Sequence, residues 1–165
     1  MVKRRFPSKT APPVGSPASQ LSGFMAKYDP AIAAEGRSAL ATLRRILPGG
    51  GELVYDNYNW LVVGFGPTER PSEAVLSLVF TPRWLTLCFL LHGAQLSDPE
   101  RLLRGSGSRV RNIRLASAKD LNRPAVRALI GEALSRGWPG FDQRRPRRLI
   151  IKSISAKQRP RRPSR

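Results

Sequence analysis

The sequence predicts an α+β domain in which an antiparallel sheet of five to six strands is packed by an N-terminal and a C-terminal helix. The first observation is a stripe of apolar residues at helical spacing over 30–47, which Asp29-Pro30 opens as an N-cap acid followed by proline. The second is a change to alternating apolar residues after the glycines at 49–51, which indicates strands. The third is a last helical stripe over 124–136.

Between these helices the alternation resolves into two hairpins and a further strand. One hairpin is expected around the YDNYNW segment and the other around Thr81-Pro82-Arg83. The outer face of the second hairpin is more apolar than a solvated face usually is, so either a helix covers it or it forms a semi-apolar groove. The expected elements are a short helix carrying Leu21, Phe24, Met25 and Tyr28, strands at 52–56, 60–66, 74–80, 84–91 and 109–115, and a helical turn from Asp98 to Leu103.

The net charge of +18 is concentrated in the two ends of the chain. Residues 1–27 carry five basic side chains and no acid, residues 143–165 carry ten and no acid, and the middle carries 14 basic and 11 acidic side chains. The expected organisation is a disordered, basic, proline-rich tail at 1–18, an α+β domain at 19–142, and a basic C-terminal tail at 143–165 that includes an additional strand at 148–154.

Several classes of protein are disfavoured by the same composition. No apolar run reaches the ~18 residues of a membrane-spanning helix, and the N-terminus lacks the apolar segment of a secretory signal, so a cytoplasmic protein without membrane contact is expected. Cys88 is the single cysteine, which excludes an intrachain disulfide.

Three separated segments carry a resemblance to a known family. They are ELVYDNYNWLVVGFGPTE at 52–69, PRWLTLCFLLHGAQLSDPERLLRGSGSRVRNIRL at 82–115 and LNRPAVRALIGEAL at 121–134. In this order and spacing they resemble the YdhG-like domain family of unknown function over residues 24–136, and LIIKSISAKQRPRR in the tail looks like the C-terminus of some relatives. The resemblance implies a compact α+β domain and little chemistry, although some members are labelled frataxin-like iron chaperones. One departure is Asn112, where relatives often have histidine.

The residues themselves give iron little support. An iron site needs several oxygen or imidazole ligands that converge on one point, whereas the first long helix offers only Asp29 and Glu35 among its arginines. Cys88 and His92 are separated by ~13 Å along a strand, too far apart to share one metal. No catalytic residue and no cofactor is predicted, so we expect no enzyme, with iron binding as an alternative that rests on the resemblance.

The aromatic segment YDNYNW indicates the tip of the first hairpin. Asp56–Asn59 are turn formers, so Tyr55 and Trp60 would anchor the two strands. Together with Tyr58 and Trp84 they are candidates for a binding rim or groove.

The GSGS segment at 105–108 is a candidate anion loop, because its glycines allow backbone N–H groups to turn toward a phosphate or carboxylate. The alternative is a glycine turn that leads into a strand whose arginines face water. An arginine pointing inward would need an acidic partner such as Asp98 or Asp120. The candidate residues of this stretch are Arg104, Gly105, Gly107, Arg109 and Arg111.

The C-terminal arginines are the candidates for contact with a phosphate backbone, which attracts cations without reading sequence. They are Arg144, Arg145, Arg147, Arg148, Arg159, Arg161 and Arg162. Neither a helix-turn-helix nor an aromatic RNA-binding signature accompanies them.

The sequence therefore favours a non-enzymatic binding module that uses the second face and rim of its sheet, with basic tails that contact anionic partners. Alternatives are an intracellular iron chaperone, a sequence-independent nucleic-acid-binding accessory protein and, last, an enzyme whose pocket joins Tyr58 and Trp60 to Arg109 and Arg111.

Overall fold

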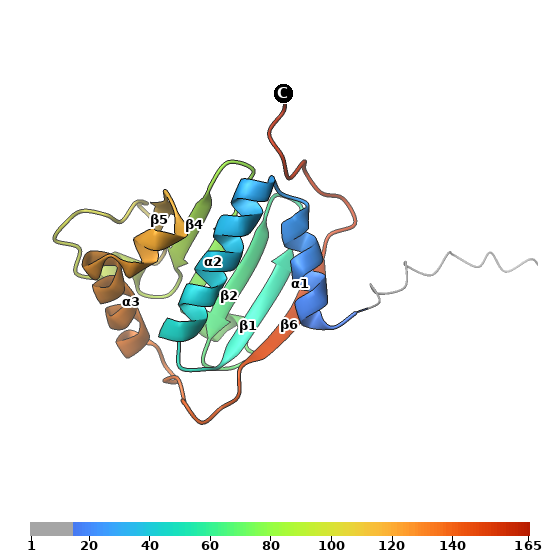
Figure 1. Ribbon diagram of the computed structural model, residues 1–165. Helices are drawn as coiled ribbons and strands as arrows, with labels where there is room; N and C mark the ends of the chain where they lie inside the picture. Colours follow the sequence, from blue (N-terminus) through green and yellow to red (C-terminus); the bar gives the residue numbers. More distant parts are fainter. Residues whose placement is uncertain (1–14) are drawn as a thin grey trace, which may run out of the picture.

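The computed structural model describes residues 15–165, which form three α-helices and a six-stranded sheet (Figure 1). The N-terminal tail expected at 1–18 lies almost wholly outside these residues. The helices are α1 (Pro17–Ala26), α2 (Pro30–Ile46) and α3 (Pro124–Arg136), and the strands are β1 (Gly51–Asp56), β2 (Leu61–Gly66), β3 (Leu76–Phe80), β4 (Leu85–Phe89), β5 (Arg111–Leu115) and β6 (Arg148–Ile154).

The strand order is β5-β4-β3-β2-β1-β6, and the predicted α+β fold is confirmed. The sheet differs from the expectation in being mixed, because β6 runs parallel to β1 while every other neighbouring pair is antiparallel. Parallel neighbours need a long crossover connection. Here the chain leaves β5 at one edge, passes through α3, and returns to the opposite edge beside β1 (Figure 1).

One face of the sheet carries the core. Alternate residues of β2 to β5 point toward the helices and are buried, as the period of two predicts for the second hairpin. The helix α2 lies across this face, and its Gly36 is the point of closest approach: a Cβ there would lie 2.0 Å from Cε1 of Phe80. The other face carries Tyr55, Val62 and Val79, which are half-buried.

Two details of residues 98–115 differ from the expectation. No helix forms after Asp98; instead its carboxylate accepts the N–H groups of Leu102 and Leu103 in a turn. The strand β5 begins at Arg111 rather than at 109, so Val110 lies before it and is exposed. In the sequence Val110 falls on the opposite side from Ile113 and Leu115, which predicts a bulge or burial on both sides; the structure explains this differently, because Val110 is not part of the ladder.

Within residues 15–165, every helix is too short or too polar to cross a bilayer.

The contact between Gly36 and Phe80 gives a test of the fold. We expect Gly36→Ala to lower the free energy of unfolding by up to about 2 kcal/mol, because overpacking a core costs about 1–3 kcal/mol and the helix-propensity gain returns only about 1 kcal/mol. Gly131→Ala, in the middle of α3, is the matched control: its Cβ would meet nothing within 4 Å, so it should stabilise. Urea unfolding of both variants measures the difference, and equal effects would contradict the packing described.

Candidate functional site

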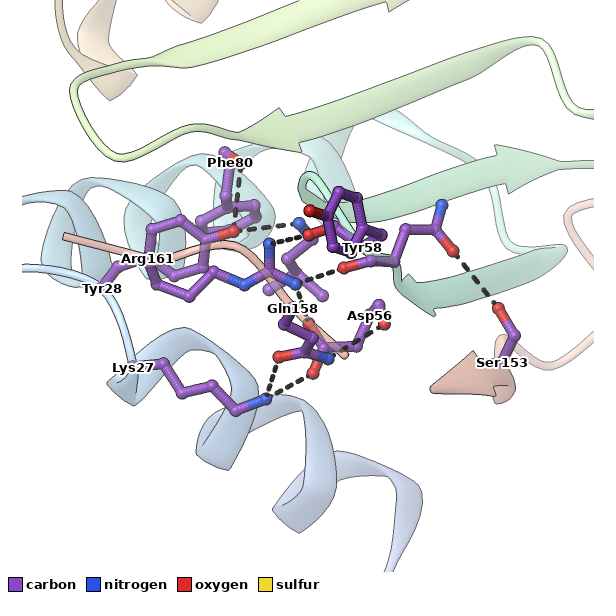
Figure 2. Close-up of polar contacts among 10 residues, drawn as sticks. Lys27, Tyr28, Asp56, Tyr58, Phe80, Ser153, Gln158 and Arg161 are labelled. Carbon is purple, nitrogen blue, oxygen red and sulfur yellow. Dashed lines mark hydrogen bonds and ion pairs between the residues drawn. The ribbon is translucent and has the colours of Figure 1, made fainter. Parts of the chain in front are cut away.

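The C-terminal segment is fixed to the fold by a buried carboxylate at the end of β1. Asp56 is fully buried, and its two oxygens take Lys27 Nζ at 2.6 Å and Arg161 Nη2 at 2.9 Å. Gln158 joins them: its amide N–H donates to the Asp56 carbonyl at 3.1 Å, and its carbonyl accepts from Lys27 Nζ at 2.9 Å. Figure 2 shows these side chains converging from α1, β1 and the C-terminal segment. We call this group the Asp56 clamp.

A buried tyrosine supports the clamp. The Tyr28 hydroxyl donates to the Phe80 carbonyl at 3.1 Å and accepts the Leu61 N–H at 2.9 Å, which ties the connection between α1 and α2 to β2 and β3. Burial raises the pKa of Tyr28, so the phenol stays protonated and can donate. The guanidinium of Arg161 lies 5.8 Å from the Tyr28 ring centroid and is almost wholly buried with it. Arg161 therefore belongs to the interior.

A second carboxylate on the same strand holds the other end of the C-terminal segment. Arg44 donates two hydrogen bonds to the Glu52 carboxylate, from Nε at 2.8 Å and from Nη2 at 2.9 Å. These hydrogen bonds raise the pKa of Arg44 above its ordinary value. Arg147 approaches the same carboxylate at 3.3 Å and also donates to the carbonyls of Arg44 and Leu47 at the end of α2. Cations at a helix C-terminus are favourable because the last carbonyls lack partners. We call this group the Glu52 clamp.

The strand expected at 148–154 is present as β6, and the chain beyond it continues along the fold to the Asp56 clamp. The structure thus gives Arg147 and Arg161 a role inside the molecule that the reading of 143–165 as a basic tail did not foresee. Three further candidates pair with acids at the surface, and Arg145 and Arg159 have no ion pair among the described residues. The surface pairs are Arg144 with Asp142, Arg148 with Glu69 and Arg162 with Asp29.

The YDNYNW segment forms the turn between β1 and β2, one residue later than expected: Asp56 is the last residue of β1 and pairs with Leu61. The Asn57 N–H donates to the Trp60 carbonyl, so Trp60 lies in the turn and does not anchor β2. Tyr58 and Trp60 are exposed at this turn, 51% and 39% of their surface respectively. Arg159 lies over Tyr58, with its guanidinium 5.9 Å from the ring centroid and its backbone N–H on the Tyr58 carbonyl. We call Tyr58 and Trp60 the aromatic rim. Tyr55 lies apart from it, half-buried in β1.

A cavity of about 370 Å³ lies at the same end of the sheet, beside the turn between β3 and β4. The guanidinium of Arg114 stacks over the Trp84 ring at 3.8 Å, a distance typical of a close cation–π contact. We call this cavity the arginine pocket. Its lining residues include Ile32, Glu35, Arg83, Trp84, Arg104 and Arg114.

The arginine pocket and the aromatic rim share one end of the sheet because of the register. Leu61 pairs with Phe80, Phe80 with Leu85, and Leu85 with Leu115, so the residues just outside these positions meet at one end. Trp60 and Trp84 lie two strands apart there, about 10 Å along the hydrogen-bonding direction.

The electrostatics of the arginine pocket are unbalanced. Arg83, Arg104 and Arg114 have no ion pair within residues 15–165. Glu35 is the acid in its lining, and one of its oxygens accepts the Ala118 N–H at 2.6 Å. A concave surface with free guanidinium groups and an indole can bind an anion that also has a flat apolar part.

The GSGS loop does not join this pocket as a whole. Arg104 pairs with Asn112 through both backbone bonds, at 2.8 and 2.9 Å, and Gly105 has the positive φ of 117° that the turn requires. Gly107 is exposed, and its carbonyl accepts from Arg111, whose guanidinium folds back onto its own loop. This resembles the glycine-turn alternative more than an anion loop.

The enzyme pocket suggested for Tyr58 and Trp60 with Arg109 and Arg111 is not formed. Arg111 pairs in register with Phe89, at the opposite end of the sheet from the aromatic rim. Arg109 lines a separate cavity with His92.

The acids give an iron site no support among the described residues, where no three His, Cys, Asp or Glu side chains gather as metal ligands do. Glu52 and Asp56, the two acids on β1, are already bound by guanidinium and ammonium groups. Cys88 lies in β4, and burial raises the pKa of its thiol, which makes it a poor nucleophile or ligand at neutral pH.

Comparison with protein-family models, curated proteins and solved structures gave no match to this chain. The resemblance to the YdhG-like family therefore stays a prediction from the sequence.

Sequence reasoning named Trp84 and Arg104 but missed three other residues of the arginine pocket: Glu35, Arg83 and Arg114. The alternation could have found Arg114, because it places Arg114 on the face opposite to Leu115 and so beside the outer face of β4. Glu35 had no local signal, since its position beside the pocket depends on how α2 crosses the sheet.

The Asp56 clamp gives a test of the C-terminal segment. We expect Arg161→Ala to lower the free energy of unfolding by about 3 kcal/mol, because it leaves a buried carboxylate with Lys27 as its remaining cation. Arg162→Ala is the matched control: its pair with Asp29 is 3.7 Å long and exposed, so a change within about 0.5 kcal/mol is expected. Urea unfolding measures both variants.

A double variant shows whether the loss of stability in Arg161→Ala comes from the unpaired Asp56 carboxylate or from the lost packing of the Arg161 side chain. Asp56→Asn combined with Arg161→Ala should be less destabilised than Arg161→Ala alone, because it removes the charge that the single change leaves unpaired. If Arg161→Ala and Arg162→Ala unfold at the same urea concentration, the clamp does not hold the fold.

Proposed function

We propose that this chain is a non-enzymatic binding module of the YdhG-like kind, and that it binds anionic partners at the end of the sheet formed by the arginine pocket and the aromatic rim. The observation that carries this proposal is that three arginines line one cavity together with Trp84, and that none of the three has an ion pair in residues 15–165. Unpaired guanidinium groups in a concave site attract phosphate and carboxylate groups strongly.

A single-stranded nucleic acid is the anionic partner that fits this surface best. Stacking of bases on aromatic side chains, next to cations that contact the backbone, is the usual way in which proteins bind single strands. Tyr58 and Trp60 supply exposed rings, and Arg159 lies beside the first of them. A strand that crosses this end of the sheet would meet the aromatic rim and then Trp84.

The basic tail contributes less to this proposal than its composition suggested. Arg147 and Arg161 are held inside the fold, whereas Arg144, Arg148 and Arg162 form exposed pairs with acids at the surface. Arg145 and Arg159 are the original candidates that have no ion pair among the described residues. The iron-chaperone alternative rests on the family resemblance, and the engagement of Glu52 and Asp56 gives it no further support.

The proposal is tested with polyuridylate, a flexible single strand, by fluorescence anisotropy at several salt concentrations. Replacing Arg83, Arg104 and Arg114 by Gln should weaken binding at least tenfold at low salt. The log–log slope against salt should fall by about 2, since each lost phosphate contact on a single strand contributes about 0.7.

Two other triple variants lose the same charge and serve as controls. Arg37→Gln, Arg45→Gln and Arg127→Gln change exposed arginines outside the pocket, which have no ion pair among the described residues, and should leave the affinity within about twofold. Arg145→Gln, Lys157→Gln and Arg165→Gln test the tail at exposed positions outside the arginine pocket and the aromatic rim. Equal losses in all three variants would mean that net charge alone drives binding, and a larger loss in the tail variant would move the site to the C-terminus.

A further inference from the structure

We infer that the arginine pocket holds one nucleotide unit and distinguishes bases by their exocyclic amino group, with Glu35 as the acceptor. This inference rests on the proposed function and adds a ligand class and a reading residue to it. Its basis is the combination, in one cavity, of an indole for stacking, unpaired guanidinium groups for a phosphate, and a carboxylate with a free oxygen.

The stacking part of the pocket is already assembled. Arg114 lies on one side of the Trp84 ring at 3.8 Å, which makes a layered pair of guanidinium and indole. Bases stack on both kinds of plane in single-strand recognition. A base bound in the arginine pocket would extend this stack.

The phosphate would meet Arg83 and Arg104. Both are exposed, both line the pocket, and neither has an ion pair in the described part of the chain. A guanidinium group can donate two parallel hydrogen bonds to two oxygens of one phosphate. A single phosphate can therefore bind Arg83, Arg104 or both. The strength of this contact is the same for every nucleotide, because all share the phosphate.

Glu35 is the part of the pocket that can tell one base from another. One of its carboxylate oxygens accepts the Ala118 N–H, and the other has no hydrogen bond from residues 15–165. A carboxylate accepts from the amino group of cytosine, whereas it would face the carbonyl oxygen of uracil at the same position. The hydrogen bond to Ala118 fixes the carboxylate in place, which makes the free oxygen a directed acceptor.

The size of the cavity limits the ligand to one unit. About 370 Å³ lies at the lower end of the ~300–1,000 Å³ range of small-molecule sites. A cavity of this size can hold one nucleotide but not a double helix. A single strand would insert one base here and continue toward the aromatic rim.

The test compares cytidine and uridine 5′-monophosphate by isothermal titration calorimetry, with inorganic phosphate as a third probe. The two nucleotides differ at the base position that Glu35 would read. We expect the cytidine nucleotide to bind about three- to tenfold more tightly, the effect of one hydrogen bond made or lost. Inorganic phosphate should bind most weakly because it lacks the stack.

Glu35→Gln is the decisive variant, since an amide offers both an acceptor and a donor and can keep the Ala118 contact. It should bring the two nucleotides within about twofold of each other, while Arg109→Gln, in the separate cavity beside His92, should preserve the difference. If Glu35→Gln melts at a lower temperature than the unmodified chain, Trp84→Leu provides the second test and should weaken both nucleotides while sparing inorganic phosphate.

The outcomes separate this inference from the proposed function. Equal affinities of the unmodified chain for the two nucleotides would overturn base reading, and so would a preference for cytidine that survives Glu35→Gln. If polyuridylate binds through the three arginines but neither mononucleotide binds, the pocket is a plain phosphate contact and only the inference fails. If polyuridylate does not bind at all while cytidine monophosphate does, the proposed function fails and the pocket remains a nucleotide site.

Discussion

Two buried carboxylates on one strand determine how this chain is closed. Glu52 and Asp56 lie on β1, on the side that faces the helices. Both carboxylates are buried there, so water cannot solvate their negative charge. Each is matched by one cation from a helix and one from the C-terminal segment. Because a buried charge without a partner is strongly destabilising, the sheet is complete only when residues 147–161 lie beside β1.

The same requirement decides where free positive charge remains. Eight of the 11 acids form ion pairs, and the other three, Glu35, Asp98 and Asp120, accept backbone N–H groups. The acids therefore act within the fold, and many arginines of residues 15–165 remain without an ion pair. Three of these arginines line the cavity at the end of the sheet together with Trp84.

Local periodicity was sufficient for the helices and for the faces of the second hairpin, because a strand's buried side follows from alternation alone. It could not supply the Asp56 clamp, since Arg161 is 105 residues away from Asp56 and neither residue has a local pattern that names the other. For this reason the sequence predicts contact with a phosphate backbone for the C-terminal arginines, because it shows their charge but not their partners inside the fold. For the candidate site, Trp84 and Arg104 could be predicted as single residues, whereas their meeting with Arg114 depends on the pairing of Thr86 with Arg114.

An acid in the lining changes what the arginine pocket can do. Three guanidinium groups alone would attract any phosphate, and salt would weaken this attraction for every ligand alike. Glu35 reduces the local positive charge, so it lowers the affinity for phosphate as such. In return it presents an acceptor whose direction is fixed by the Ala118 N–H. Polar groups of this kind contribute discrimination more than strength, because the wrong base must leave the carboxylate unpaired or meet it with a like partial charge.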